Sequence, residues 1–90
     1  MDFEFLLAMG SIARIEPSPE LCKKEMEESE YDLRAAGKCL SEKDAKWSII
    51  KSYYSMFHGA KGVLFLIGFR EKTHRGLADA LDVLCREGTL

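Results

Sequence analysis

Two long segments with helical periodicity follow one another, and only residues 41–43 separate them. The first segment begins at Ser18, a suitable N-cap, with Pro19 at the first helical position and Glu20 beside the positive end of the helix dipole. The second begins with Asp44 as its cap and runs to about residue 68. Because a short connection forces neighbouring helices to run antiparallel, the pattern predicts a long helical hairpin.

Each predicted helix carries a stripe of small or apolar side chains spaced alternately by four and three residues. The first stripe comprises Cys22, Met26, Ser29, Leu33, Ala36 and Leu40, and the second comprises Ser48, Ser52, Ser55, Gly59 and Gly62. Such spacing is typical of helices that pack nearly parallel to a partner. A glycine inside a helix costs about 1 kcal/mol relative to alanine. The two glycines therefore predict that another backbone or a ligand approaches this stripe, and helix packing is the favoured explanation.

The flanking segments predict two shorter helices. The first is expected over about residues 3–14, ending before Pro17. Residues 69–72 are expected to form a loop, and we find no strand pattern. Thr73 is expected to cap a last helix, whose buried face carries leucines at 77, 81 and 84.

The last predicted helix is too short to cover the hairpin. The second hairpin helix is apolar enough to be covered on two sides, so we expect either a further helix after residue 90 or cover from a second copy of the chain. With 90 residues there is room for one domain. The sequence predicts an all-α fold over residues 1–90, an up-and-down bundle of four to five helices around a long central antiparallel hairpin, lacking a C-terminal helix.

Charge is distributed unevenly along the chain, although the net charge is only −2. Residues 1–45 carry 6 basic and 11 acidic side chains, whereas residues 46–90 carry 7 basic and 4 acidic ones. The run Glu25, Glu27, Glu28, Glu30 and Asp32 is expected to form a solvated helix face, with an acidic surface that faces a partner as the alternative. Basic residues gather between positions 46 and 75: they are Lys46, Lys51, Lys61, Arg70, Lys72 and Arg75. Contacts with a polyanion are expected there.

The three cysteines have no CxxC spacing, which favours a reducing compartment, and we expect a cytoplasmic protein. No apolar stretch is long enough to span a bilayer, so no membrane contact is expected. A single Glu-x-x-His pair, Glu71 and His74, is half of what a di-iron bundle requires, so we expect no metal and no cofactor.

A possible chemical site lies on the second hairpin helix. Lys51, Tyr54 and His58 are three and four residues apart, which places a cation, a phenol and an imidazole on one helix face. RNA chemistry needs a group that titrates near neutral pH at the 2′-hydroxyl and a cation at the phosphate, and His58 and Lys51 are of those types. The alternative interpretation is a hydrogen-bonded core histidine beside a packed tyrosine.

The strings KWSIIKSYYSMFHGAK at residues 46–61 and GFREKTHRGL at residues 68–77 resemble the HEPN domain family. The segments EPSPEL at 16–21 and EYDL at 30–33 are similar to its prokaryotic stand-alone branch. The resemblance implies an all-α bundle that dimerises and that often sits beside a minimal nucleotidyltransferase in toxin–antitoxin pairs. Many members are metal-independent ribonucleases with an Arg, four to six residues, and then a His. His58 matches this histidine, but Lys51 stands at the arginine position.

Two functions are compatible with these residues. The first is a dimeric HEPN module that binds RNA or a nucleotide and cleaves RNA as a toxin, with His58 as acid/base and Lys51 as electrostatic stabiliser. Its expected nucleic-acid or nucleotide contacts are Tyr54, Lys61, Arg70, Lys72, His74 and Arg75. The second is a non-catalytic interaction module that binds a nucleotidyltransferase partner or a nucleotide. A lysine keeps the charge of an arginine but loses the planar fork that grips a phosphate, which weakens the case for cleavage.

Overall fold

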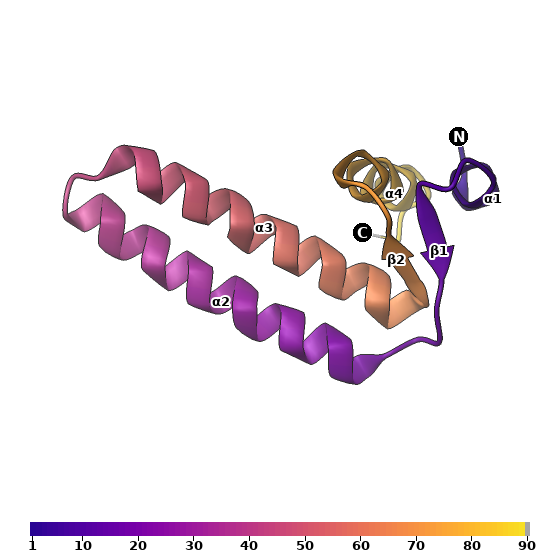
Figure 1. Cartoon of the computed structure of the whole chain (residues 1–90), viewed down its shortest axis with the longest axis horizontal. Coiled ribbons are helices and arrows are strands. Elements are labelled where there is room, and N and C mark those ends of the chain that lie inside the picture. The colour runs from indigo at the N-terminus through magenta and orange to yellow at the C-terminus, as the bar shows by residue number, and fades with distance from the viewer. Residues whose placement is uncertain (90) are drawn as a thin grey trace.

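The computed structural model describes residues 1–89, which form four helices and two short strands. Along the chain these are α1 (Phe3–Ala8), β1 (Ile12–Arg14), α2 (Pro19–Ser41), α3 (Ala45–Ile67), β2 (Phe69–Glu71) and α4 (His74–Arg86). Figure 1 shows α2 and α3 side by side as a long antiparallel hairpin, with the other elements gathered at one end. The predicted all-α class and its central hairpin are confirmed.

Local capping sets the ends of the hairpin helices. The Ser18 side chain accepts a hydrogen bond from the Leu21 amide at 3.1 Å, and the Asp44 side chain accepts one from the Trp47 amide at 3.3 Å. Gly68 ends α3 in the left-handed conformation with φ 94°, which glycine adopts without a steric cost. The caps expected at Ser18 and Asp44 are therefore confirmed.

The small-residue stripe of α3 packs directly against α2. A β-carbon at Gly62 would lie 2.9 Å from the Met26 methyl group and 3.3 Å from the Cys22 carbonyl oxygen. Hydroxyl groups join the two helices further along, because Ser55 donates to the Ser29 carbonyl at 2.8 Å and Ser29 donates to the Ser55 carbonyl at 2.7 Å. Close packing of two helices, the favoured explanation, accounts for this stripe.

Two expectations for the flanking segments are wrong. Helix α1 ends at Ala8, well before residue 14, because Gly10 turns the chain with φ 73°, and the following residues form β1. The expected loop over residues 69–72 contains β2, which pairs antiparallel with β1 so that Ile12 lies opposite Glu71. Strands of three residues are too short to show the alternation that identifies a strand in a sequence. Their pairing joins segments at opposite ends of the chain.

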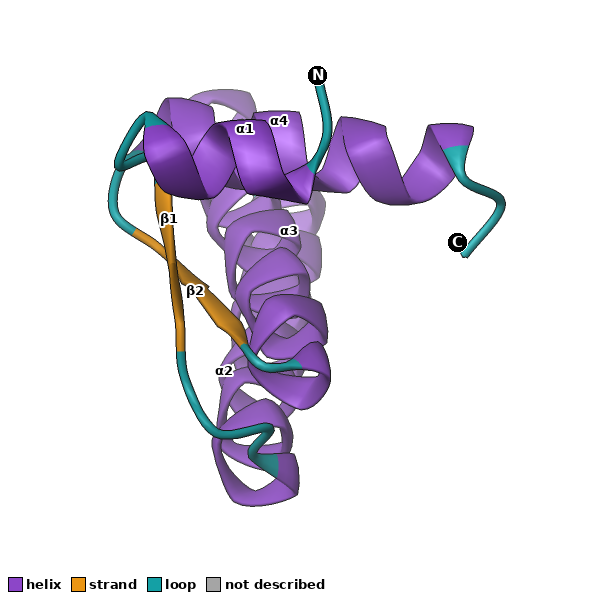
Figure 2. Ribbon diagram, turned by 90° about the vertical axis from the view of Figure 1, so that its right-hand side faces the viewer, coloured by secondary structure: helices purple, strands orange, loops and turns teal. Residues whose placement is uncertain are grey.

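The hydrophobic core lies at the end of the hairpin where α1 and α4 run across α3 (Figure 2). Its buried members are Leu6, Ile12, Leu64, Leu77, Ala80, Val83 and Leu84. Gly76 allows α4 to approach the turn after α1, because a β-carbon at this position would overlap the Ser11 carbonyl oxygen. This core fixes α4 and the two strands against the C-terminal half of α3.

The far end of the hairpin is uncovered within residues 1–89, and the molecule measures 45 × 25 × 23 Å. Leu33 and Leu40, expected in the stripe between the helices, are 60% and 64% exposed. On α3, Ile49 and Met56 are 70% and 68% exposed. The expectation that α3 is covered on two sides therefore holds at its C-terminal half and fails at its N-terminal half.

Candidate functional site

His58 projects from α3 into a group of charged side chains. Its Nδ1 lies 2.5 Å from Oε2 of Glu25, and its Nε2 lies 3.7 Å from Oδ2 of Asp32. The Nζ of Lys61 lies 3.6 Å from Oε1 of Glu25 and 4.0 Å from Oε2 of Glu71. We call these five residues the charged cluster. Their side chains are 11% to 25% exposed, so the cluster is mostly buried but still accessible to water.

The contact with Glu25 defines the tautomer of the neutral His58 ring. A carboxylate can only accept a hydrogen bond, so Nδ1 carries the proton and donates a hydrogen bond to Glu25. Nε2 is too far from Asp32 for a hydrogen bond in this geometry, which leaves its lone pair free. A carboxylate that orients an imidazole and stabilises its charged form is a recurrent arrangement in acid–base catalysis.

The expectation that Glu25 and Asp32 belong to a solvated face is wrong, because their side chains are only 15% and 21% exposed. Glu27, Glu28 and Glu30 are exposed as expected, whereas Glu25 and Asp32 turn toward α3. A signal was present in the sequence, since positions 25 and 32 are seven residues apart and lie on one face of a helix. The apolar side chains of Leu33 and Leu40 instead indicate a buried face on their own side of the helix.

Lys61 is held within the charged cluster. In addition to its two carboxylate partners, its Nζ lies 5.4 Å from the centre of the Phe57 ring and 5.8 Å from that of Phe65. Its charge is therefore largely compensated by groups of the same chain. For a nucleic acid, Lys61 is a less available contact than the sequence predicted.

Lys51 and Tyr54 precede His58 on the same side of α3. Lys51 is partly buried and forms no ion pair with any of residues 1–89, so its charge has no partner in this part of the chain. Tyr54 is 47% exposed and touches the Tyr53 ring edge to face at 5.6 Å between centres. Helical spacing places both along the stripe that leads to His58.

Most side chains of the basic segment that follows α3 lie away from the charged cluster. His74 stacks on Phe57 at 4.7 Å between ring centres, and its Nδ1 lies 2.9 Å from the Tyr53 hydroxyl. Arg75 is exposed and pairs with Asp79 at 3.4 Å. The exposed Arg70 and Lys72 flank Glu71, through which this segment reaches the charged cluster.

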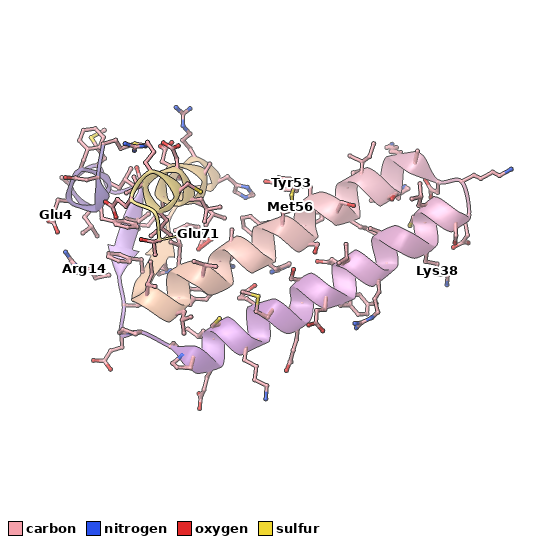
Figure 3. The ribbon with its side chains drawn as sticks, turned by 180° about the vertical axis from the view of Figure 1, so that it is seen from behind. Glu4, Arg14, Lys38, Tyr53, Met56 and Glu71 are labelled. Carbon is pink, nitrogen blue, oxygen red and sulfur yellow. The ribbon has the colours of Figure 1, made fainter. Side chains whose placement is uncertain are left out.

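His74 also borders a hollow between α3 and α4 of about 300 Å³. The hollow is lined by Tyr53, Met56, Phe57, Ala60, His74, Leu77, Ala78 and Leu81. Figure 3 shows Tyr53 and Met56 on the side of α3 that turns away from α2. His58 and His74 thus serve two different faces of α3.

Two features are absent from residues 1–89. None of the helices there combines the length and the apolar character needed to cross a membrane. No three His, Cys, Asp or Glu side chains of this range are arranged so that they could hold a metal ion.

The fold and the charged cluster define a small α-helical module built on one long hairpin, with a carboxylate-bound histidine where the two helices face each other. The family model of the HEPN domain matches residues 23–90, and the chain belongs to this family. The resemblance found in the strings at 46–61 and 68–77 is thereby confirmed.

A curated relative is a UPF0332 protein of Pyrococcus horikoshii, which is 37% identical over 59 residues. The alignment covers 66% of this chain and 42% of the relative, so the chain spans less than half of that protein. No solved structure matches the chain.

Proposed function

We propose that this HEPN module binds RNA and cleaves it, with His58 as the group that transfers protons. The proposal rests on the 2.5 Å contact between His58 and Glu25, because it orients the ring and leaves Nε2 free at a partly exposed position. An imidazole titrates close to neutral pH, so it can take up and release a proton under physiological conditions. The charged cluster would stabilise the imidazolium that forms.

The reaction follows from what Nε2 can do. It accepts the proton of an RNA 2′-hydroxyl while the 2′-oxygen forms a bond to the adjacent phosphorus. The bond from phosphorus to the 5′-oxygen breaks, and that oxygen takes up a proton from water or from a second imidazolium. The products are a 2′,3′-cyclic phosphate and a 5′-hydroxyl, and no oxidant or cofactor is consumed.

Charge around His58 dictates where the phosphate can lie. The carboxylates of Glu25 and Asp32 on α2 and of Glu71 on β2 repel a phosphate and are only partly offset by Lys61. Lys51, which has no ion-pair partner among residues 1–89, is the cation on the open side. We therefore expect the phosphate to approach along the N-terminal half of α3, with Lys51 as its electrostatic stabiliser.

A homodimer would add to this site. The uncovered half of the hairpin exposes apolar side chains such as Ile49 and Met56, which a second copy would bury. A second copy could also bring the exposed Arg70, Lys72 and Arg75 toward the Lys51 side of its neighbour. We propose that the domain works as a homodimer in the cytoplasm, where its free cysteines remain reduced.

Cleavage of a labelled single-stranded RNA tests the proposal, with His58→Ala as the variant and His74→Ala as the matched control. A proton-transfer group typically contributes about 10²- to 10⁴-fold to rate, so His58→Ala should lose cleavage by that factor. His74→Ala should keep it, because His74 faces the hollow on the other side. Cleavage that survives in His58→Ala, or that is lost equally in both variants, would overturn the assignment.

A second candidate is a non-catalytic interaction module that binds a minimal nucleotidyltransferase or a nucleotide. The apolar hollow at Met56, Phe57 and Leu81, continuous with the exposed α3 side chains, favours this function. In this case, wild-type protein does not cleave RNA, and a copurifying nucleotidyltransferase is released by Met56→Glu.

A further inference from the structure

We infer that the N-terminal half of α3 is a binding track for single-stranded RNA, on which bases stack against Trp47 and Tyr54 and the backbone passes Lys51 on its way to His58. The inference deepens the proposed function, because it presumes that the module binds RNA. It adds which form of RNA is bound, where it lies, and which side chains hold it.

Four side chains make up the track: Trp47, Lys51, Tyr54 and His58. Their spacings of four, three and four residues place them along one face of α3. With a rise of about 1.5 Å per residue, Trp47 and Tyr54 lie about 10 Å apart along the helix axis, and Trp47 and His58 about 16 Å apart. The track is therefore long enough for a few nucleotides.

Both aromatic rings of the track face water. Trp47 is 48% exposed and Tyr54 is 47% exposed, although these are the side chains that gain most from burial. A Trp or Tyr ring half open to solvent offers a flat surface on which any unpaired base can stack. Paired bases in a duplex keep their faces covered by their neighbours, so the track should select single strands.

The charges of α3 suit a polyanion. The helix contains Lys46, Lys51 and Lys61 and no aspartate or glutamate at all. Lys46 lies 5.9 Å from the centre of the Trp47 ring, and Lys51 stands between the two aromatic residues. Asp44 caps the start of the helix, and Asp32 faces His58 from α2, so carboxylates mark both ends of the track.

A partner helix is the main alternative occupant, and the composition of the track disfavours it. The side of α3 that presents Ile49 and Met56 carries no charged side chain of α3 and borders the mainly apolar hollow beside α4, as a helix-binding face would. In the track, by contrast, a lysine separates two aromatic rings, and a histidine follows. Alternating rings and cations are typical of surfaces that bind single-stranded nucleic acid.

Trp47 is the single tryptophan of the chain, so its fluorescence reports directly on the track. The probe is a twelve-nucleotide uridine RNA that is 2′-O-methylated throughout and cannot be cleaved at a 2′-hydroxyl. We expect saturable quenching of Trp47 by the single strand and little quenching when the probe is annealed to its complement. Raised salt should weaken binding, and Lys51→Gln should make that salt dependence shallower.

Tyr54→Leu is the decisive variant, with Tyr31→Leu as the matched control. Tyr31 is 65% exposed but lies on α2, off the track. Because stacking on one aromatic ring commonly changes affinity about tenfold or more, Tyr54→Leu should weaken binding by that factor and Tyr31→Leu should not. Trp47→Leu should lose as much affinity for the RNA as Tyr54→Leu, and the fluorescence anisotropy of a labelled probe measures this affinity. Circular dichroism melting confirms that each variant is folded.

The outcomes separate this inference from the proposed cleavage. Quenching without any cleavage of an unmodified RNA supports the track and refutes the nuclease. Cleavage that persists while Trp47 is not quenched, or while Tyr54→Leu and Tyr31→Leu bind equally, overturns the track and leaves the nuclease intact. Equal quenching by single strand and duplex also overturns it, because stacking requires unpaired bases.

Discussion

Glu25→Gln is the substitution that most sharply separates the structural role of the charged cluster from a chemical one. Glutamine keeps the shape of the side chain and removes its charge. Glu71→Gln is its matched control, because both carboxylates lie near Lys61 and both are well buried, with 15% and 11% of the side chain exposed. Only Glu25 also contacts His58.

The expected loss of stability follows from the distances. A hydrogen bond to a charged group contributes about 1.5–3 kcal/mol, and a neutral one about 0.5–1.5 kcal/mol. Because the introduced amide can still accept a neutral bond from Nδ1 of His58, Glu25→Gln should lower the free energy of unfolding by about 1 kcal/mol, or roughly 4–8 °C in Tm for a domain of this size. Glu71→Gln gives up a looser 4.0 Å contact and should cost less than about 0.5 kcal/mol.

Urea unfolding of single and double variants measures the coupling itself. A double-mutant cycle between Glu25→Gln and His58→Ala should give an interaction energy of about 1 kcal/mol, whereas the cycle between Glu71→Gln and His58→Ala should give a value near zero. If Glu25 also positions His58 for chemistry, Glu25→Gln should reduce kcat for RNA cleavage and leave KM nearly unchanged.

Two results would refute the reasoning. Equal destabilisation by Glu25→Gln and Glu71→Gln, or a coupling energy near zero between positions 25 and 58, would mean that the pair does not form in solution. A clear coupling energy together with an unchanged kcat would assign the pair to stability alone and remove Glu25 from the chemistry.

The remaining predictions concern packing and assembly. Gly76→Ala should lower stability by about 2 kcal/mol, because overpacking against the Ser11 backbone outweighs a gain of about 1 kcal/mol in helix propensity. Gly59→Ala meets only the Ser29 hydroxyl at 3.5 Å and should raise stability by up to about 1 kcal/mol; thermal melts compare the two signs. Light scattering should give the mass of a dimer, and a monomer at micromolar concentration would contradict the proposed assembly.

The hairpin could be predicted because its determinants are local. The caps at Ser18 and Asp44 bind amides only three residues away, and Gly68 ends its own helix. Such signals can be recognised in a short stretch of sequence without knowledge of the tertiary structure. The small-residue stripe could also be interpreted, since two glycines in one helix require a close neighbour. The paired strands β1 and β2 could not, because each is stabilised by a segment at the other end of the chain.

The histidine of the site could be found in the sequence, but its carboxylate partners could not. His58 stands in a motif, whereas Glu25 becomes its neighbour only once α2 and α3 adopt one rotation about their axes. Heptad spacing predicts which stripe of a helix is buried only to within about one position. If the buried stripe includes Leu33, an apolar side chain faces α3, whereas if it includes Asp32, a carboxylate faces His58. The observed rotation leaves Leu33 60% exposed and turns Asp32 inward.

Opposite charges on the two hairpin helices are paired in that rotation. Helix α2 is rich in carboxylates, and α3 carries only cations and a histidine. With Glu25 facing His58 and Lys61, the partly buried charges on the two helices have partners instead of lying unpaired. Lys51 lies beyond the reach of this compensation. Its surplus charge, beside two exposed aromatic rings, is the feature of α3 that packing does not explain and that binding of an anion would.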